Sequence, residues 1–221
     1  MPQTRKTLKS RSPRNTERSF ARTRVPTPQS TALSIHNHLL QGKNVSYIET
    51  PNKSKGPIQF KYLVFHYTAG RSTRSTVNWL TNQDAKASAH LIVGRDGAIT
   101  QLAPFTAKTW HAGRSHWDGL SGLNQYSIGI EMDNAGPLKL VGTKLQAWFG
   151  KFYPKAQAFQ GKHKLETEVQ WWHTYTEIQI TTAVELAKLL VKTYQLKEIV
   201  GHDDIAPDRK RDPGPAFPLI H

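Results

Sequence analysis

Cysteine is absent from this sequence of 221 residues, and acidic side chains are scarce in it. Without cysteine the chain has no disulfide, no thiolate metal ligand and no thiol nucleophile, so any metal must bind through His, Asp or Glu. Long apolar runs are also missing: the sequence holds no stretch of about 18 apolar residues, the length of a transmembrane helix. No apolar segment follows the positively charged N-terminus, so no ordinary signal peptide is visible.

Basic residues dominate the charge, with 30 Lys and Arg against 16 Asp and Glu, a net charge of +14 and a pI of about 10.0. Residues 1–30 carry half of the excess, with eight Lys or Arg against the single acid Glu17. They are rich in Ser, Thr and Pro, and we interpret residues 1–35 as a flexible basic arm. A basic arm favours polyanions, but a solvated tail without a partner is an equally good interpretation. Only Phe20 offers a base a stacking surface there, which argues against specific nucleic-acid recognition.

Residues 36–221 are expected to form one α/β domain, with a single mixed central sheet flanked by helices. Residues 31–43 predict a short helix that ends at Gly42, and residues 137–173 are interpreted as an irregular insertion. The other expected elements are a strand at 59–67, a helix at about 73–82, a hairpin over 89–102 that turns at Asp96-Gly97, a strand at 127–132, a long amphipathic helix behind a capping box at Thr176–Gln179, and a strand at 197–200.

Two of these strands end at or near a histidine, His66 in LVFHYTAG and His202 in IVGHDD, and Asp212 follows on a proline-rich loop. Two imidazoles and one carboxylate suit a catalytic zinc site, which keeps a fourth position for water. Such a site also needs a general base and a cation for a developing oxyanion. Glu131, alone on the polar face of its strand, suits the first role, and Lys210, two residues before Asp212, suits the second.

Plainer interpretations of the same residues stay open at this point. Each histidine taken alone is as well explained by an ordinary buried or surface position. Glu131 can pair with a lysine, and Asp212 can cap a turn. Arg211, between Lys210 and Asp212, has no assigned role: it faces either an anionic substrate or solvent.

Five motifs, in order, resemble the zinc-dependent N-acetylmuramoyl-L-alanine amidase type 2 family, which includes AmpD-type amidases, phage endolysins and peptidoglycan recognition proteins. They are FHYTAG (65–70), SAHLIVGRDG (88–97), TWHAGRS (109–115), SIGIEMDNAG (127–136) and GHDDIAPDRKRDPGPAF (201–217). The last is especially similar to the AmpD-type members. The resemblance covers about residues 60–218 and implies the fold of that family.

Position by position, the resemblance implies that one Zn²⁺ is held by His66, His202 and Asp212. It implies that Glu131 is the catalytic acid and base and that Lys210 is the cation near the metal. Phage lysozyme-like members have a catalytic tyrosine where this chain has Ala89, so the arrangement with Glu131 and Lys210 is the one implied. His90 is expected to be structural rather than a ligand.

The implied activity is hydrolysis of the amide between N-acetylmuramic acid and L-alanine, in peptidoglycan or in muropeptides. Groove and substrate contacts are expected from Tyr67, Trp110, His111, Ala112, Gly113 and Asn134. Two alternatives remain: a wall-binding module without catalysis, and a recycling amidase that acts on anhydro-muropeptides in the cytoplasm. We expect synthesis in the cytoplasm, with action either there or on the cell wall after delivery by another route. The basic arm is then expected to bind an anionic envelope polymer or lipid.

Overall fold

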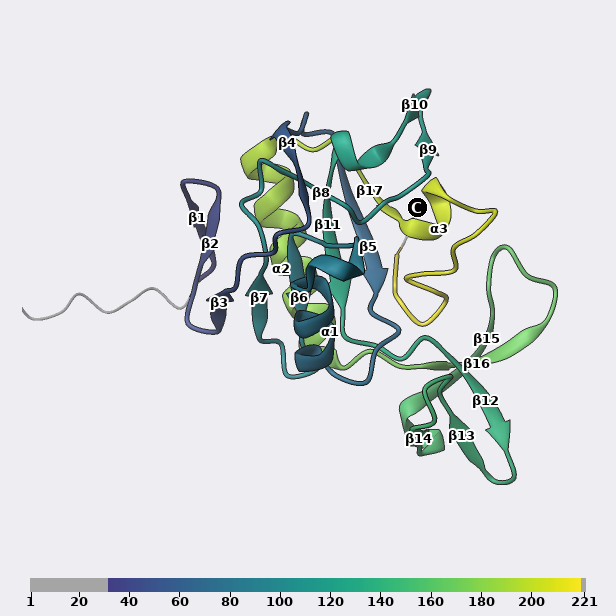
Figure 1. The fold of residues 1–221 in the computed structure, drawn as a ribbon. Coiled ribbons are helices and arrows are strands. Elements are labelled where there is room, and N and C mark those ends of the chain that lie inside the picture. The colour runs from purple at the N-terminus through teal and green to yellow at the C-terminus, as the bar shows by residue number, and fades with distance from the viewer. Residues whose placement is uncertain (1–31, 220–221) are drawn as a thin grey trace, which may run out of the picture.

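The computed structural model describes residues 32–219, so the predicted arm up to residue 31 lies outside the described residues. Its centre is a six-stranded mixed sheet (Figure 1). In spatial order the strands are β17 (Glu198–Gly201), β5 (Tyr62–Tyr67), β11 (Ser127–Met132), β6 (Leu91–Val93), β7 (Ile99–Gln101) and β3 (Val45–Tyr47). The first four run parallel, β7 is antiparallel to β6, and β3 is parallel to β7. The predicted mixed central sheet is confirmed.

Helices cover both faces of this sheet: in Figure 1, α1 (Thr73–Leu80) lies in front of it and α2 (Glu177–Tyr194) behind it. Alternate residues of the strands serve the two sides, as the period of a strand requires. On β11, Ile128, Ile130 and Met132 belong to the core cluster that includes α2, and Glu131 points to the other face. The predicted capping box at Thr176 is confirmed at the start of α2.

The predicted hairpin over 89–102 is also confirmed, with Gly97 at φ +78° in the turn between β6 and β7. Short elements complete this part of the chain. They are β4 (Lys53–Pro57) paired with β8 (Ala107–Thr109), β9 (His116–Trp117) paired with β10 (Leu120–Ser121), the 3₁₀ helices at Gln83–Ala85, Leu123–Gln125 and Lys155–Gln157, and α3 (His202–Ile205).

The helix predicted for residues 31–43 is wrong, because part of this segment forms a hairpin of β1 (Ser34–His36) and β2 (Leu39–Gln41). Asn37 and His38 both have positive φ, 48° and 62°, which is the conformation of a two-residue type I′ turn. The side chain of Gln101 fixes the hairpin, since its oxygen accepts from Leu40 N at 2.7 Å and its nitrogen donates to His38 O at 3.2 Å. β1 crosses the predicted boundary at residue 35.

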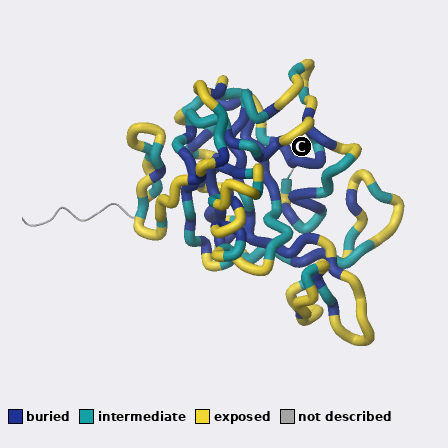
Figure 2. The backbone as a smooth tube through the Cα atoms, in the orientation of Figure 1, coloured by how far each residue is buried: buried dark blue, intermediate teal, exposed yellow. Residues whose placement is uncertain are grey.

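Residues 137–173 are not irregular, which corrects the prediction. They form a five-stranded antiparallel sheet, called the outer sheet below, in the order β14 (Phe152–Tyr153), β13 (Lys144–Gln146), β12 (Pro137–Val141), β16 (Val169–His173) and β15 (Ala158–Lys162). Leu138, Leu145 and Tyr153 form a small core of their own. Figure 1 shows this sheet beside the C-terminal loop, and Figure 2 shows that much of its backbone is exposed.

Within residues 32–219, no helix has both the length and the apolar character needed to cross a membrane.

Candidate metal centre and its cleft

The candidate site lies where three parallel strands of the central sheet end. His66 is the fifth residue of β5, and its register partner on β11 is Glu131. β17 pairs Gly201 with Phe65, so His202 follows one residue beyond that pair, beside His66. Parallel strands bring such residues to one edge of the sheet, where open α/β sheets commonly bind their ligands. Strand register alone therefore gathers two histidines and the glutamate.

Asp212 joins this group from the C-terminal loop. Its carbonyl oxygen accepts from Asp203 N at 2.8 Å, and the hydroxyl of Tyr175 donates to Pro213 O at 2.8 Å. The three candidate ligand atoms then form a close triangle. His66 Nδ1 lies 2.8 Å from His202 Nδ1 and 3.0 Å from Asp212 Oδ2, and the third side measures 2.9 Å. All three residues are buried.

The outer nitrogen of the His66 ring begins a chain of hydrogen bonds. His66 Nε2 lies 3.0 Å from His111 Nδ1, and His111 Nε2 lies 3.2 Å from the hydroxyl of Ser127, which itself donates to Leu123 O at 2.6 Å. Because the Ser127 proton is used in that last bond, the consistent assignment has each Nε2–H donating outward. His66 Nδ1 then carries a lone pair that points into the triangle.

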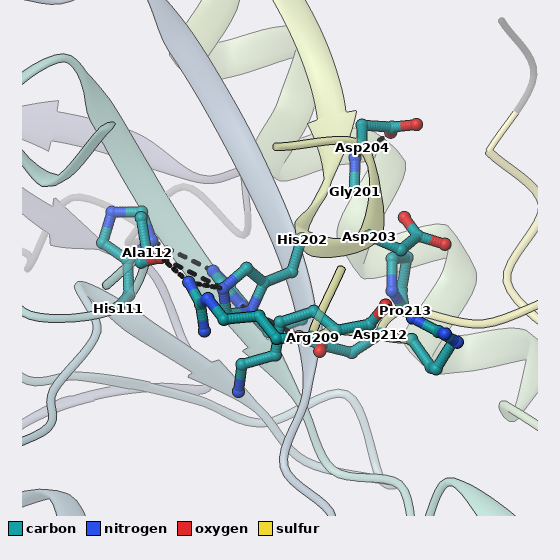
Figure 3. A network of polar contacts seen from close by, with 12 residues as sticks. His111, Ala112, Gly201, His202, Asp203, Asp204, Arg209, Asp212 and Pro213 are labelled. Atoms are coloured by element: carbon teal, nitrogen blue, oxygen red, sulfur yellow. Dashed lines mark hydrogen bonds and ion pairs between the residues drawn. The ribbon is translucent and has the colours of Figure 1, made fainter. Parts of the chain in front are cut away.

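His202 is held in the same tautomer by a different partner. Its Nε2 donates to Ala112 O at 3.2 Å, and the Arg209 guanidinium shares that carbonyl (Figure 3). The lone pair of His202 Nδ1 therefore also faces the triangle. Outer hydrogen bonds of this kind orient histidine ligands and fix their tautomer.

The charges of the triangle suit a cation. Burial lowers the pKa of His66 to about 4, and proximity to His202 adds to this effect. Burial alone would raise the pKa of Asp212, but the contacts of its carboxylate with His202 and His66 outweigh burial and hold the pKa below its ordinary value. A neutral His66 imidazole beside an ionised Asp212 carboxylate has the protonation states that metal ligands need.

Glu131 is the acid next to this triangle. Its Oε2 is buried, and no hydrogen-bond partner for that atom lies among residues 32–219. Burial raises the pKa of Glu131 well above its ordinary value, the Asp212 carboxylate raises it further, and Lys210 opposes both effects. A buried carboxyl with a raised pKa and a free oxygen is suited to accepting and returning a proton.

These groups share one cleft, a cavity of about 750 Å³. His66, His202, Asp212, Glu131 and Lys210 all line it. Its walls are completed chiefly by small residues, by three tryptophans and by two further cations: Trp79, Trp110, Trp148, Arg209 and Arg211. The cleft has the size of a small-ligand site.

Comparison with known proteins agrees with this geometry. The family profile for N-acetylmuramoyl-L-alanine amidases matches residues 55–215. The chain belongs to this family. It is 36% identical to the N-acetylmuramoyl-L-alanine amidase AmiD of Escherichia coli (strain K12) over 169 residues, which are 72% of this chain and 51% of AmiD. It is 33% identical to the 1,6-anhydro-N-acetylmuramyl-L-alanine amidase AmpD of the same strain, over 60% of this chain and 54% of AmpD.

A solved structure supports the same assignment. E. coli AmiD in complex with the substrate anhydro-N-acetylmuramic acid-L-Ala-D-gamma-Glu-L-Lys has a TM-score of 0.56 and 31% identity, covering 76% of this chain and 55% of that one. The predicted amidase fold is thereby confirmed. The chain spans about half the length of the curated relatives that it matches.

The residues predicted to bind substrate in this amidase domain lie in different places. Tyr67 and Trp110 line the cleft, and the Trp110 indole N–H donates to the Ser54 hydroxyl at 2.8 Å. Burial, and then the charge of Asp212, raises the pKa of Tyr67 above its ordinary value. His111 also touches the cleft, but its ring is buried and both of its nitrogens face His66 and Ser127.

Three of the predicted contact residues are not on the cleft wall. Asn134 is buried, with its side-chain nitrogen donating to His173 O at 2.9 Å and its oxygen accepting from Gly136 N at 2.8 Å. Ala112 is buried and offers its carbonyl to His202, and Gly113 packs against Arg209. Ala112 and Gly113 therefore do not line the groove as predicted, and a contact of Asn134 with the substrate stays a prediction.

Two contacts that the sequence analysis did not predict support the ligand loop, the C-terminal loop that carries Asp212, from the outer sheet. The loop between β15 and β16 carries His163, whose Nε2 lies 2.8 Å from Asp203 Oδ2, both residues being buried. Glu166 of the same loop pairs with Arg211, which answers where Arg211 points. His90, as expected, is structural: its Nε2 donates to Ala107 O at 2.8 Å, and its Nδ1 accepts from Gly129 N at 3.0 Å.

Proposed function

We propose that this chain hydrolyses the amide bond between N-acetylmuramic acid and L-alanine in peptidoglycan or muropeptides. The observation that carries the proposal is the buried triangle of His66, His202 and Asp212 with Glu131 in register beside it. The names of the relatives AmiD and AmpD agree with this activity. A non-catalytic binding module is disfavoured, because it has no need of an acid with a free oxygen and a raised pKa.

The donor set fits one Zn²⁺ per chain. Two imidazole nitrogens and one carboxylate oxygen converge within about 3 Å of one another, and no cysteine competes. Three protein ligands with one place left open are typical of catalytic zinc. When bound, zinc supplies Lewis acidity, which lowers the pKa of a water molecule and polarises a carbonyl group. His66, His202 and Asp212 hold it there.

Glu131 moves the proton. Its free Oε2 takes a proton from the attacking water and later gives it to the leaving amine of L-alanine. A carboxyl whose pKa is raised is the stronger base when ionised and can still act as an acid in the next step.

Lys210 stabilises the charge that develops on the substrate carbonyl. It lines the cleft two residues before Asp212, and its charge acts on both His66 and Glu131. The ground-state amide is neutral at that oxygen, and a fixed cation there therefore acts on the rate more than on binding. His111, through His66, is a positioning residue rather than a substrate contact.

The proposal includes two candidate substrates and two candidate places of action. The cleft is compatible with intact peptidoglycan and with anhydro-muropeptide. The first substrate corresponds to action on the cell wall, and the second to action in the cytoplasm. The basic arm before residue 32 is proposed to bind anionic envelope polymers or lipids. It lies outside the described residues, and its deletion followed by a sacculus-binding assay at two salt concentrations tests that role.

The function is tested by incubating zinc-loaded and chelated protein with intact sacculi and with soluble anhydro-muropeptide, and identifying products by mass. We expect free stem peptides beginning with L-alanine, formed only by the zinc-loaded protein. If neither substrate releases such peptides, or if chelation has no effect, the proposal fails.

A further inference from the structure

Trp148 is exposed at the cleft although it belongs to the outer sheet. It lies between β13 and β14, and 77% of it is accessible, more than any other large apolar residue within residues 32–219. It lines the same cleft as His66 and Glu131. Exposing an indole in water is unfavourable, and a large exposed aromatic in a cleft often marks a binding surface.

The indole is fixed rather than free. Its Nε1–H donates to Ala69 O at 2.8 Å, in the loop that follows β5. Phe149 packs edge-on against it, with ring centroids 5.6 Å apart. Arg71 in turn donates to Phe149 O at 2.7 Å and lies 5.4 Å above the Phe149 ring. These contacts tie the tip of the β13–β14 hairpin to the rim of the cleft.

The loop that receives this hairpin is itself held in an uncommon conformation. Ala69 has a φ of +47°, a conformation that is unfavourable for a residue with a Cβ. Such a conformation persists only where its surroundings hold it. Because the position of Trp148 is set in advance, little side-chain entropy is lost when a ligand covers it.

The chemistry of the cleft narrows what the indole can bind. Its N–H is already used, so only the ring face remains for a ligand. That face attracts cations, but Arg209 and Lys210 on the cleft wall disfavour an ammonium group nearby. Those cations instead suit the carboxylates of a stem peptide. A neutral partner with a C–H-rich face is left for Trp148, and a pyranose ring has one.

We propose that Trp148 is a saccharide-binding platform, so that the outer sheet selects substrates by their glycan. This inference rests on the proposed function for its substrate class. The platform makes no bond to the reacting atoms, so it acts on binding and leaves the chemical step unchanged. Longer glycans then gain affinity from it, and changes in the stem peptide do not alter its contribution.

The test compares Trp148→Ala and Trp148→Phe with Phe159→Ala, the control. Phe159 is an aromatic residue of the same sheet, 41% exposed, and is not part of the cleft wall. Substrates with one, two and four sugars on the same tetrapeptide are hydrolysed, and the two-sugar substrate is repeated with a tripeptide. We expect Trp148→Ala to raise KM for the longer glycans about tenfold, the loss of a contact worth about 1.4 kcal/mol. We expect kcat to stay constant, Trp148→Phe to lie between, and Phe159→Ala to match wild type.

A binding measurement separates this inference from the activity. Calorimetry with glycan strands freed of peptide needs no hydrolysis, and Trp148→Ala should weaken that binding about tenfold. If wild type binds the glycan but cleaves nothing, the proposed function fails and the platform stands. If the variant binds peptide-free glycan as well as wild type does, or if its KM follows peptide length instead, the saccharide platform is overturned.

Discussion

The central and outer sheets use their residues in opposite ways. In the central sheet, β5 and β11 are almost entirely buried, as is the second half of β17, and these strands deliver His66, Glu131 and His202 to one edge. In the outer sheet, large apolar side chains such as Leu140, Trp148, Phe152 and Phe159 are exposed. Parallel strands buried on both faces hold side chains in a fixed register. The proposed chemistry therefore sits on the rigid sheet, and the outer sheet meets the cleft only through loops.

Two loops of the outer sheet lie near the cleft, and they have different effects on it. The β13–β14 hairpin places Trp148 on the wall, where a ligand can touch it. The β15–β16 loop stays behind the ligand loop, through His163 on Asp203 and Glu166 on Arg211. We therefore expect substitutions in the central sheet to remove metal or turnover, and substitutions in the outer sheet to change affinities by smaller factors. The predictions below test that division.

Asp212→Ala should have the largest effect. It removes the only carboxylate of the triangle and leaves two imidazoles, a much weaker zinc site. We expect metal content after dialysis to fall from about one equivalent to near zero, and turnover to disappear with it. Asp208→Ala is the matched control, since Asp208 lies on the same loop with its side chain exposed beside Arg114. Full zinc retention in Asp212→Ala would refute its role as a ligand.

Glu131→Gln should keep the metal and lose the proton transfer. The substitution preserves the shape of the side chain but removes its ability to take a proton at Oε2. We expect kcat to fall about 10²–10⁴-fold, the usual contribution of a general acid and base. Zinc content and thermal unfolding should match wild type. A kcat within a factor of ten of wild type would show that the proton takes another route.

His163→Ala should have a smaller effect, although its side chain is as deeply buried as the ligands. The substitution leaves Asp203, whose main chain holds Asp212, without its imidazole partner. Loss of an outer hydrogen-bond partner costs about 10–100-fold in metal affinity, and His163 acts one step further away, so we expect the lower end. Competition with a chelator measures it, with exposed Lys162→Ala on β15 as the control. An unchanged affinity would mean that the outer sheet plays no part in the metal site.

Local signals in the sequence were enough to predict five of the six strands of the central sheet, and β3 was missed. The hairpin with Asp96-Gly97, the capping box at Thr176 and the alternation of β11 are set by neighbours in the chain, and all three are confirmed. The hairpin at residues 34–41 was missed because its apolar spacing also fits a helix. Two positive φ angles, at Asn37 and His38, decide between them. The outer sheet was missed because its strands are short and half exposed, so their alternation is weak.

The site was predictable as a set of residues but not as a network. Motif order indicated the ligand set, yet His111 was assigned to the substrate groove. The sequence held one signal for the position of His111, because a glycine inside a strand often marks a close approach of another group. Gly129 on β11 is such a glycine: a Cβ there would lie 2.4 Å from His111 Cγ. The pairing of His163 with Asp203 spans 40 residues. No local pattern predicts such a contact.

The last effect expected is on the pH dependence of stability, and it arises at His90, next to β6 of the central sheet, and at His173 on β16 of the outer sheet. Burial lowers the pKa of His90 to about 4 and that of His173 to about 3, while in the unfolded chain both titrate near 6.5. Between those values the unfolded chain binds more protons, so stability is full above about pH 6.5 and falls as the pH drops toward 4. His90 alone contributes at most about 3 kcal/mol of that loss.

Urea unfolding of chelated protein at pH 7 and pH 4.5 measures the difference in stability. His90→Gln should be less stable at pH 7 but lose less on acidification, whereas His116→Gln, at an exposed position, should follow wild type. Equal acid losses in His90→Gln and wild type would show that burial does not hold His90 neutral.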